Sequence, residues 1–304
     1  MPTYIVESYL ILHIEHCLSS LYIVSVVMYS MHTVNLNSLI QSMADVKTRD
    51  VTIDLDANVT ARLYIPSDTP TAMKLPILIY IHGGAFNHGS AKDPKWDNHL
   101  KSLTSQGHLL SVSIDYRLAP QHRLPAAYDD ADPWVAEHGD LDRLFVAGDS
   151  AGANISHQVA LRAGDNGVKI RGTALVDPYF WGEKPLPNET TNIVKRNLVL
   201  ADWELAMPES TRWTLDHPWI NPIAEGAPSL GRLGCKKLLV CVATEDDLQW
   251  RGKAYYQAAV KEMGSYKVVE LFESKGGHDF HLIDPYSKEA IKLVNKLVSF
   301  FTTA

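Results

Sequence analysis

The chain has 304 residues, of which 46% are hydrophobic and 21% charged, and its formal net charge is −7 at pH 7. These values are typical of a soluble globular protein with one large domain or two small ones, and without a long basic run we expect no nucleic-acid partner. Cys17, Cys235 and Cys241 are too few and too scattered for a disulfide framework or a zinc site, which indicates a reducing compartment and a cytoplasmic location.

Residues 1–46 are atypical because they contain no Lys or Arg. A signal peptide needs a positively charged start, so that interpretation is not favoured. Residues 17–31 are uncharged and largely apolar, but Glu15 interrupts the longer run that a membrane-spanning helix needs. We expect residues 1–46 to form a helix or cap packed on the domain, and membrane association through residues 8–31 is the alternative.

Residues 47–304 alternate between expected strands and helices, which predicts an α/β fold with a mainly parallel sheet and helices on both faces. An opening hairpin is expected from strands at 50–55 and 61–65. Further strands are expected at 76–81, 109–114, 144–147, 170–176, 237–244 and 267–272, and helices at 97–106, 151–161, 250–263 and 287–301.

Two connections between these elements are unusual. Residues 121–142 leave room only for a short helix at 126–137, which we expect Pro133 to break. Residues 177–234 are rich in Pro and Trp and too long for a simple loop, so we expect the end of a helical crossover and an inserted cap over the site.

The sequence Gly148-Asp149-Ser150-Ala151-Gly152 lies between an expected strand and an expected helix. A G-x-S-x-G sequence in this context is typical of a nucleophile elbow, where a sharp turn exposes the serine hydroxyl above the sheet. Glycines on both sides allow the close approach of neighbouring backbone that this turn requires. The pentapeptide alone is equally compatible with an ordinary turn.

A nucleophilic serine needs a base, and the base needs an acid to orient it. In this architecture the chain order is serine, acid, histidine, and each residue follows the carboxyl end of a strand. Asp246 follows the strand at 237–244, and His278 follows the strand at 267–272. Each residue alone could be an ordinary surface residue, but together Ser150, Asp246 and His278 match the order and the loop positions of a catalytic triad.

Attack on a carbonyl places negative charge on oxygen, which backbone N–H donors must stabilise. We expect these donors from Gly83 and Gly84, in the loop that follows the strand at 76–81, and from Ala151 at the start of the helix after the elbow. A flexible turn is the alternative for the two glycines. This chemistry requires no metal and no cofactor.

Several motifs of the chain resemble those of the plant carboxylesterases, in the hormone-sensitive-lipase-like branch of the α/β hydrolases. The resemblance extends from about residue 51 to the C-terminus and is specific because the motifs occur in combination. They are His82-Gly83-Gly84-Ala85-Phe86, Asp115-Tyr116-Arg117-Leu118-Ala119-Pro120, Gly148-Asp149-Ser150-Ala151-Gly152-Ala153-Asn154 and His278-Asp279-Phe280-His281.

The resemblance implies an α/β-hydrolase fold and hydrolysis of small-to-medium acyl esters of specialised metabolites or xenobiotics, with a small-molecule ester as partner. It favours Asp246 over Asp247 as the acid and His278 over His281 as the base. The chain departs from the family pattern in residues 1–46 and in the connection at 129–140, which is shorter and has less helix. Both departures bear on access to Ser150.

Two other functions are known on this scaffold. The chain resembles the gibberellin receptors, which keep the serine but have lost the catalytic histidine, so His278 argues against a receptor. It also resembles the 2-hydroxyisoflavanone dehydratases, which carry Thr at the position of Ser150, so the serine favours hydrolysis.

The aromatic residues Phe86, Phe180, Trp181 and Trp219 are candidates for lining an apolar substrate pocket. Packing between the cap and the rest of the domain is the alternative use of these side chains.

Overall fold

The computed structural model describes residues 43, 45–69, 74–137, 141–210 and 212–303. Residues 45–304 form one compact unit. The expectations for residues 1–46 lie outside the described part of the chain, apart from a strand that begins at Val46. Within the described ranges, no helix has both the length and the apolar character needed to cross a membrane. The cytoplasmic location stays a prediction.

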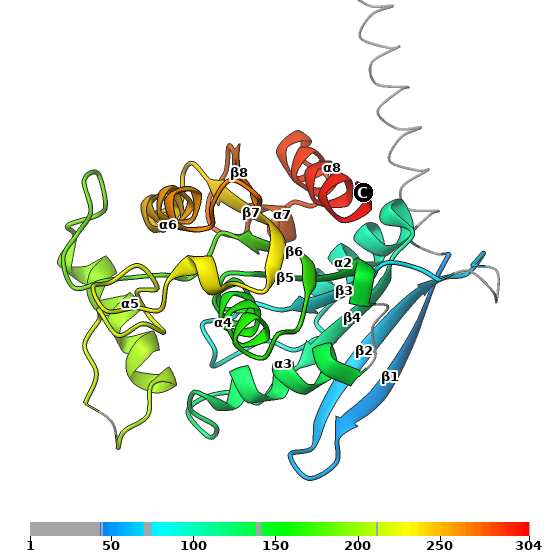
Figure 1. The fold of residues 1–304 in the computed structure, drawn as a ribbon, viewed down its shortest axis with the longest axis horizontal. Helices are drawn as coiled ribbons and strands as arrows, with labels where there is room; N and C mark the ends of the chain where they lie inside the picture. The colour runs from blue at the N-terminus through cyan, green and yellow to red at the C-terminus, as the bar shows by residue number, and fades with distance from the viewer. Residues whose placement is uncertain (1–42, 44, 70–73, 138–140, 211, 304) are drawn as a thin grey trace, which may run out of the picture. The chain divides into compact units, whose positions relative to one another are not determined.

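An eight-stranded sheet runs through this unit in the order β1-β2-β4-β3-β5-β6-β7-β8 (Figure 1). The β1–β2 and β2–β4 pairs are antiparallel, and all other neighbouring strands are parallel. The strands are β1 (Val46–Asp54), β2 (Val59–Pro66), β3 (Ile77–Ile81), β4 (Leu110–Asp115), β5 (Leu144–Asp149), β6 (Ile170–Val176), β7 (Cys235–Ala243) and β8 (Val268–Ser274).

Helices cover both faces of the sheet (Figure 1), which confirms the predicted layers. One face packs against α2 and α8, and the other against α3, α4 and α6. The α-helices are α2 (Pro94–Gly107), α3 (Ala126–Glu137), α4 (Ala151–Asp165), α5 (Ile193–Ala206), α6 (Gln249–Glu262), α7 (Phe280–Ile283) and α8 (Lys288–Thr302).

Strand β3 shows why the sequence of a central strand is a continuous run of apolar residues. Ile79 and Ile81 pack into the core under α3, α4 and α6, whereas Leu78 and Tyr80 pack into the core under α2 and α8. Successive side chains of a strand point to opposite faces, so a strand covered on both faces needs apolar residues at nearly every position.

Helix α3 corrects the expectation for the connection at 121–142. The helix continues through Pro133 and ends at Glu137, so the proline does not break it and the connection is more helical than expected. A proline removes a single backbone donor. The helix is also held from outside, because the Arg117 guanidinium donates to both carboxylate oxygens of Asp130.

The connection between β6 and β7 contains α5 and a short 3₁₀ helix at Leu230–Arg232. The carboxyl end of α5 is held by Arg123, which precedes α3. The Arg123 guanidinium donates to the carbonyl oxygens of Glu204, Leu205 and Met207 at 2.5, 2.8 and 3.0 Å. These bonds satisfy carbonyls that the helix end leaves without intrahelical donors. That this connection caps the site stays a prediction.

A buried ion pair fixes the start of the same connection to α6. Arg251 donates to both carboxylate oxygens of Glu189 at 2.8 Å, and it also donates to the carbonyl oxygen of Lys184. The side chains of Arg251 and Glu189 are 3% and 0% exposed. Each charge therefore depends on the other, because neither reaches water.

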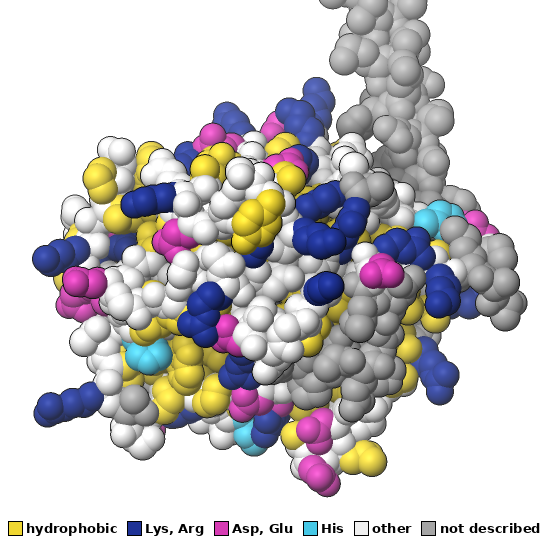
Figure 2. Space-filling view, in the orientation of Figure 1, with side chains coloured by type: hydrophobic (Ala, Val, Ile, Leu, Met, Phe, Trp, Pro, Cys, Tyr) yellow, Lys and Arg dark blue, Asp and Glu magenta, His cyan; other side chains and the backbone are white. Residues whose placement is uncertain are grey.

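Charged side chains are dispersed over the face drawn in Figure 2, where Lys and Arg lie among Asp and Glu. Several charged side chains of the described residues are paired, as in the exposed ion pair between Arg232 and Asp165 at 2.7 Å. This dispersion agrees with the expectation of no nucleic-acid partner, which stays a prediction.

We expect Glu189→Gln to destabilise the fold by about 3–5 kcal/mol, because it leaves the Arg251 charge buried without its counterion. Urea unfolding measures the change. Asp165→Asn is the matched control, since it breaks an exposed pair worth at most about 1 kcal/mol. Equal effects of the two substitutions would contradict the structural role assigned to Glu189.

Candidate active site

Ser150 lies in a sharp turn between β5 and α4. Its backbone has φ 52° and ψ −119°, a conformation that is unfavourable for a residue with a Cβ atom and that functional sites often hold in place. Two hydrogen bonds secure it. The Ser150 N–H donates to the carbonyl oxygen of Val176 at 2.9 Å, and the Tyr179 N–H donates to the carbonyl oxygen of Ser150 at 3.0 Å.

The two glycines of the elbow are required by close backbone contacts. A Cβ atom on Gly148 would lie 2.5 Å from the carbonyl oxygens of Gly152 and Ile81, and a Cβ atom on Gly152 would collide with the Ile81 carbonyl group. At both positions, α4 lies so close to β3 that there is no room for a side chain.

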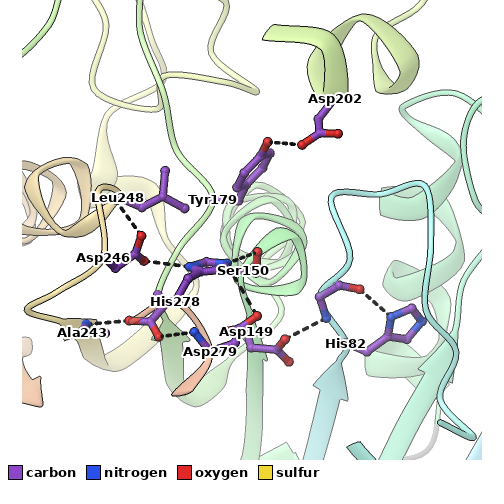
Figure 3. Close-up of polar contacts among 12 residues, drawn as sticks. His82, Asp149, Ser150, Tyr179, Asp202, Ala243, Asp246, Leu248, His278 and Asp279 are labelled. Atoms are coloured by element: carbon purple, nitrogen blue, oxygen red, sulfur yellow. Dashed lines mark hydrogen bonds and ion pairs between the residues drawn. The ribbon is translucent and has the colours of Figure 1, made fainter. Parts of the chain in front are cut away.

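The three residues predicted as a triad lie in hydrogen-bond contact (Figure 3). The Nε2 atom of His278 is 2.8 Å from Ser150 Oγ, and its Nδ1 atom is 2.7 Å from Asp246 Oδ2. The other oxygen of Asp246 accepts the Leu248 N–H at 3.0 Å. This arrangement can withdraw a proton from the serine and orient the imidazole while it does so.

The charges around His278 change its basicity. Burial alone lowers the pKa of this histidine, but the carboxylates of Asp279, Asp246 and Asp177 together raise it to about 10. Opposite charges within a few ångströms favour the protonated imidazole. His278 is therefore a stronger base than an unperturbed histidine, and it gives up its proton only at higher pH.

The loop after β3 differs from expectation at Gly83. The Gly83 N–H donates to Asp149 Oδ2 at 3.0 Å, so it is not free to stabilise an oxyanion. By contrast, the N–H groups of Gly84, Ala85 and Ala151 donate to no other residue within the described ranges. Ala85 has φ 47°, and this strained turn after β3 leaves its N–H unpaired.

Asp149 is the buried residue between β5 and the nucleophile, and its position within G-x-S-x-G gave no signal of its role. Its carboxylate accepts hydrogen bonds from Tyr80 Oη at 2.9 Å and from Trp96 Nε1 at 3.0 Å, in addition to the one from the Gly83 N–H. Burial raises the pKa of Asp149 to about 6, although these donors lower it. The carboxylate joins β3, α2, the Gly83 loop and the elbow.

Tyr116, in the second motif of the resemblance, fixes the other side of the Gly83 loop. Its hydroxyl donates to the carbonyl oxygens of His82 and Gly83 at 3.1 and 3.3 Å. The His82 ring stacks on Tyr116 with 4.4 Å between ring centroids. Burial lowers the pKa of His82 to about 4, so this imidazole is neutral, and its Nδ1 atom lies 2.8 Å from the carbonyl oxygen of Gly83.

Three of the four aromatic candidates for substrate contact are core residues. Phe180 lies against His157 and Tyr255, and the Trp181 ring faces the Arg196 guanidinium. Both side chains are almost fully buried, which argues against direct contact with a substrate.

The third buried candidate, Phe86, lies closer to the site. It packs against Tyr179 and Trp203, so it links the Gly83 loop to α5. Trp219 is half-buried beside Tyr128, and its contact with substrate stays a prediction.

Two sets of side chains each offer three potential ligand atoms within 4.8 Å of one another. They are Asp177, Asp279 and His281, and Asp177, Asp246 and His278. In the second set, Asp246 and His278 already bind each other. Both oxygens of Asp177 accept backbone N–H groups. Asp177 belongs to both sets, and its two oxygens already accept hydrogen bonds, so we assign no metal ligands here.

Comparison with known proteins finds relatives with the same fold. The family described as having an alpha/beta hydrolase fold matches residues 78–282. The chain is 39% identical over 267 residues to a probable carboxylesterase 2 from Arabidopsis thaliana, covering 83% of this chain and 84% of that protein. It is 40% identical over 280 residues to a 2-hydroxyisoflavanone dehydratase from Glycyrrhiza echinata, covering 84% and 85%.

Among solved structures, a hyperthermophilic esterase from the archaeon Pyrobaculum calidifontis superposes with a TM-score of 0.73 at 25% identity. The match covers 90% of this chain and 92% of the esterase. The predicted fold class is thereby confirmed.

We expect Gly152→Ala to abolish the organised site, because its methyl group meets backbone that cannot move without separating α4 from β3. The loss of stability should exceed the about 1–3 kcal/mol typical of overpacking, and thermal unfolding measures it. Gly277→Ala is the control, since a Cβ atom there meets nothing within 4 Å. A stable Gly152→Ala protein would show that the contact with Ile81 is not restrictive.

Proposed function

This chain belongs to the plant carboxylesterases of the alpha/beta hydrolase family, and we propose on this basis that it hydrolyses carboxylic esters with Ser150 as the nucleophile. The observation that carries the proposal is the His278 imidazole, which is hydrogen-bonded to Ser150 Oγ on one side and to Asp246 on the other.

In the first half of the reaction, Ser150 Oγ attacks the ester carbonyl while His278 Nε2 takes the hydroxyl proton. Asp246 holds the Nδ1–H and stabilises the imidazolium. The same Nε2 proton then passes to the oxygen of the leaving alcohol, and an acyl group remains on Ser150.

In the second half, His278 takes a proton from water, which attacks the acyl carbonyl. The Nε2 proton then returns to Ser150 Oγ as the carboxylic acid leaves. In both halves, negative charge develops on the carbonyl oxygen. We assign its stabilisation to the N–H groups of Gly84, Ala85 and Ala151, because these donors bind no other described residue and Gly83 already donates to Asp149.

The proposed substrates are small-to-medium acyl esters of specialised metabolites or xenobiotics. Dehydration is the second candidate, because one relative is a 2-hydroxyisoflavanone dehydratase at 40% identity. A panel of p-nitrophenyl esters from acetate to long acyl chains, assayed beside a 2-hydroxyisoflavanone, separates the two functions. Ester turnover without dehydration supports the proposal, and the reverse result replaces it.

Acyl-enzyme chemistry gives the direct test of the nucleophile. We expect a fluorophosphonate to label the native protein on Ser150 and to leave Ser150→Ala unlabelled, with ester hydrolysis reduced by at least about a thousandfold. Intact-mass and peptide mass spectrometry measure the label. Ser156→Ala is the control, because this buried serine of α4 donates to the Gly152 carbonyl oxygen and lies outside the triad. Labelling of both Ser150→Ala and the native protein would exclude the assignment.

The pH dependence of hydrolysis should follow His278. The neutral imidazole is the active base, and its pKa is raised above the ordinary 6.5, so activity should rise with pH and reach half of its maximum above pH 6.5. The pH profile of kcat/KM measures this in the free enzyme. A half-maximum at or below pH 6.5 would contradict the electrostatics of the site.

A further inference from the structure

A second carboxyl group lies beside the proposed base. Asp279 directly follows His278, and its Oδ2 atom is 3.5 Å from His278 Nε2, the nitrogen that also contacts Ser150. On the opposite side of the ring, Asp246 Oδ2 lies 2.7 Å from His278 Nδ1. The imidazole is thus bracketed by a carboxyl group at each nitrogen (Figure 3). The triad uses only the one at Nδ1.

The backbone of Asp279 is held independently of its carboxyl group. Its φ of 52° is left-handed, and its N–H donates to Asp177 Oδ2 at 3.2 Å. Asp177 is itself fixed by the Ala243 N–H, which donates to its other oxygen at 2.7 Å. The Asp279 carboxyl makes no hydrogen bond that secures this loop, and its Oδ1 atom has no partner within the described ranges. The group therefore remains available to His278.

Asp177 and Asp279 are buried carboxyl groups whose pKa values are both raised. Burial raises the pKa of Asp177 to about 8, and the nearby Asp279 adds to the rise. Burial also raises the pKa of Asp279, to about 7, but the charge of His278 opposes that rise. Asp279 is the one of these two carboxyl groups that lies next to a ring nitrogen of His278, and the charge of the imidazolium favours its ionised form.

We propose that Asp279 is a positioning residue whose carboxylate stabilises the Nε2–H imidazolium of His278, so that it strengthens the base and moves activity to higher pH. This inference rests on the proposed esterase function. After His278 takes the Ser150 proton, the Nε2–H faces both the leaving group and Asp279 Oδ2. The carboxylate favours proton capture and opposes proton release, which sets the working pH of the site.

The other groups around the imidazole do not replace Asp279. His99 and His281 are buried and neutral, because burial lowers the pKa of each. Within the described ranges, the charged or titratable groups that act on His278 or its carboxyl partners come from β3, from the ends of β5, β6 and β7, from the residue after His278 and from α2. They are Tyr80, Asp149, Asp177, Asp246, Asp279 and Lys95. Of the charged groups in the described part of the chain, only Asp246 and Asp279 lie at a ring nitrogen of His278.

The test is Asp279→Asn, because asparagine has the same shape and tolerates the left-handed backbone. We expect the acidic limb of kcat/KM to move down by about one pH unit or more. The variant should then exceed the native enzyme at acidic pH and fall several-fold below it on the alkaline plateau, because a weaker base captures the serine proton less readily. A merely structural defect lowers activity at every pH, so the crossing of the two profiles is the signature.

Asp247→Asn is the matched control. This exposed carboxylate pairs with Lys195 at 2.6 Å, and its removal should leave the pH profile in place. Asp279→Gly is the second variant, since glycine accepts the same backbone conformation and deletes the carboxyl group entirely. It should shift the acidic limb in the same direction as Asp279→Asn.

A readout that needs no ester turnover separates this inference from the proposed function. The His278 ring is titrated by NMR in protein labelled with ¹³C-histidine, and its signal is assigned by its loss in His278→Gln. A lower midpoint in both Asp279 variants supports the role of Asp279. An unchanged midpoint in both overturns it. A native protein that hydrolyses no ester and resists fluorophosphonate overturns the esterase proposal instead, whatever the titration shows.

Discussion

The structure of the site depends on one buried carboxylate, that of Asp149. It accepts hydrogen bonds from Tyr80 on β3, from Trp96 on α2 and from the backbone of Gly83. A buried carboxylate is costly unless donors surround it, so these groups can satisfy it only in one mutual arrangement. That arrangement places the loop after β3 beside Ser150, and the N–H groups of Gly84 and Ala85 bind no other residue in the described part of the chain. The same carboxylate thereby links the core to the proposed oxyanion site.

The carboxyl ends of β5 to β8 supply the remaining groups, and left-handed residues turn them toward one another. Ser150, Asp177 and Asp279 all have positive φ values, which non-glycine residues adopt at an energetic cost. Tertiary hydrogen bonds hold these conformations, because Asp177 binds the backbone of both Ala243 and Asp279. The strain lies in the turns that present the nucleophile and the base, while the regular strands below them remain unstrained.

The connection between β6 and β7 is tied to this frame at several points. Trp203 of α5 packs on Phe86 of the Gly83 loop and on Tyr179, and Arg251 of α6 holds Glu189 in the core. Phe180 and Trp181, in the same connection, were predicted as candidates for substrate contact. Both are buried and pack against other side chains of the domain. An apolar side chain fits a substrate pocket and a core equally well, so composition does not distinguish the two uses.

Periodicity alone determined the layered α/β arrangement, because buried parallel strands read as continuous apolar runs and the helices as amphipathic segments. Motif order likewise indicated Ser150, Asp246 and His278 as the residues to be brought together, since each follows a strand, and the family resemblance favoured Asp246 over Asp247 and His278 over His281. Only the tertiary structure decided that Gly83 binds Asp149, that α3 continues through Pro133, and that Asp279 faces the imidazole. Gly83 and Asp149 are distant in the sequence, and contacts from other segments hold the backbone of α3 and of Asp279. A linear pattern does not contain these contacts.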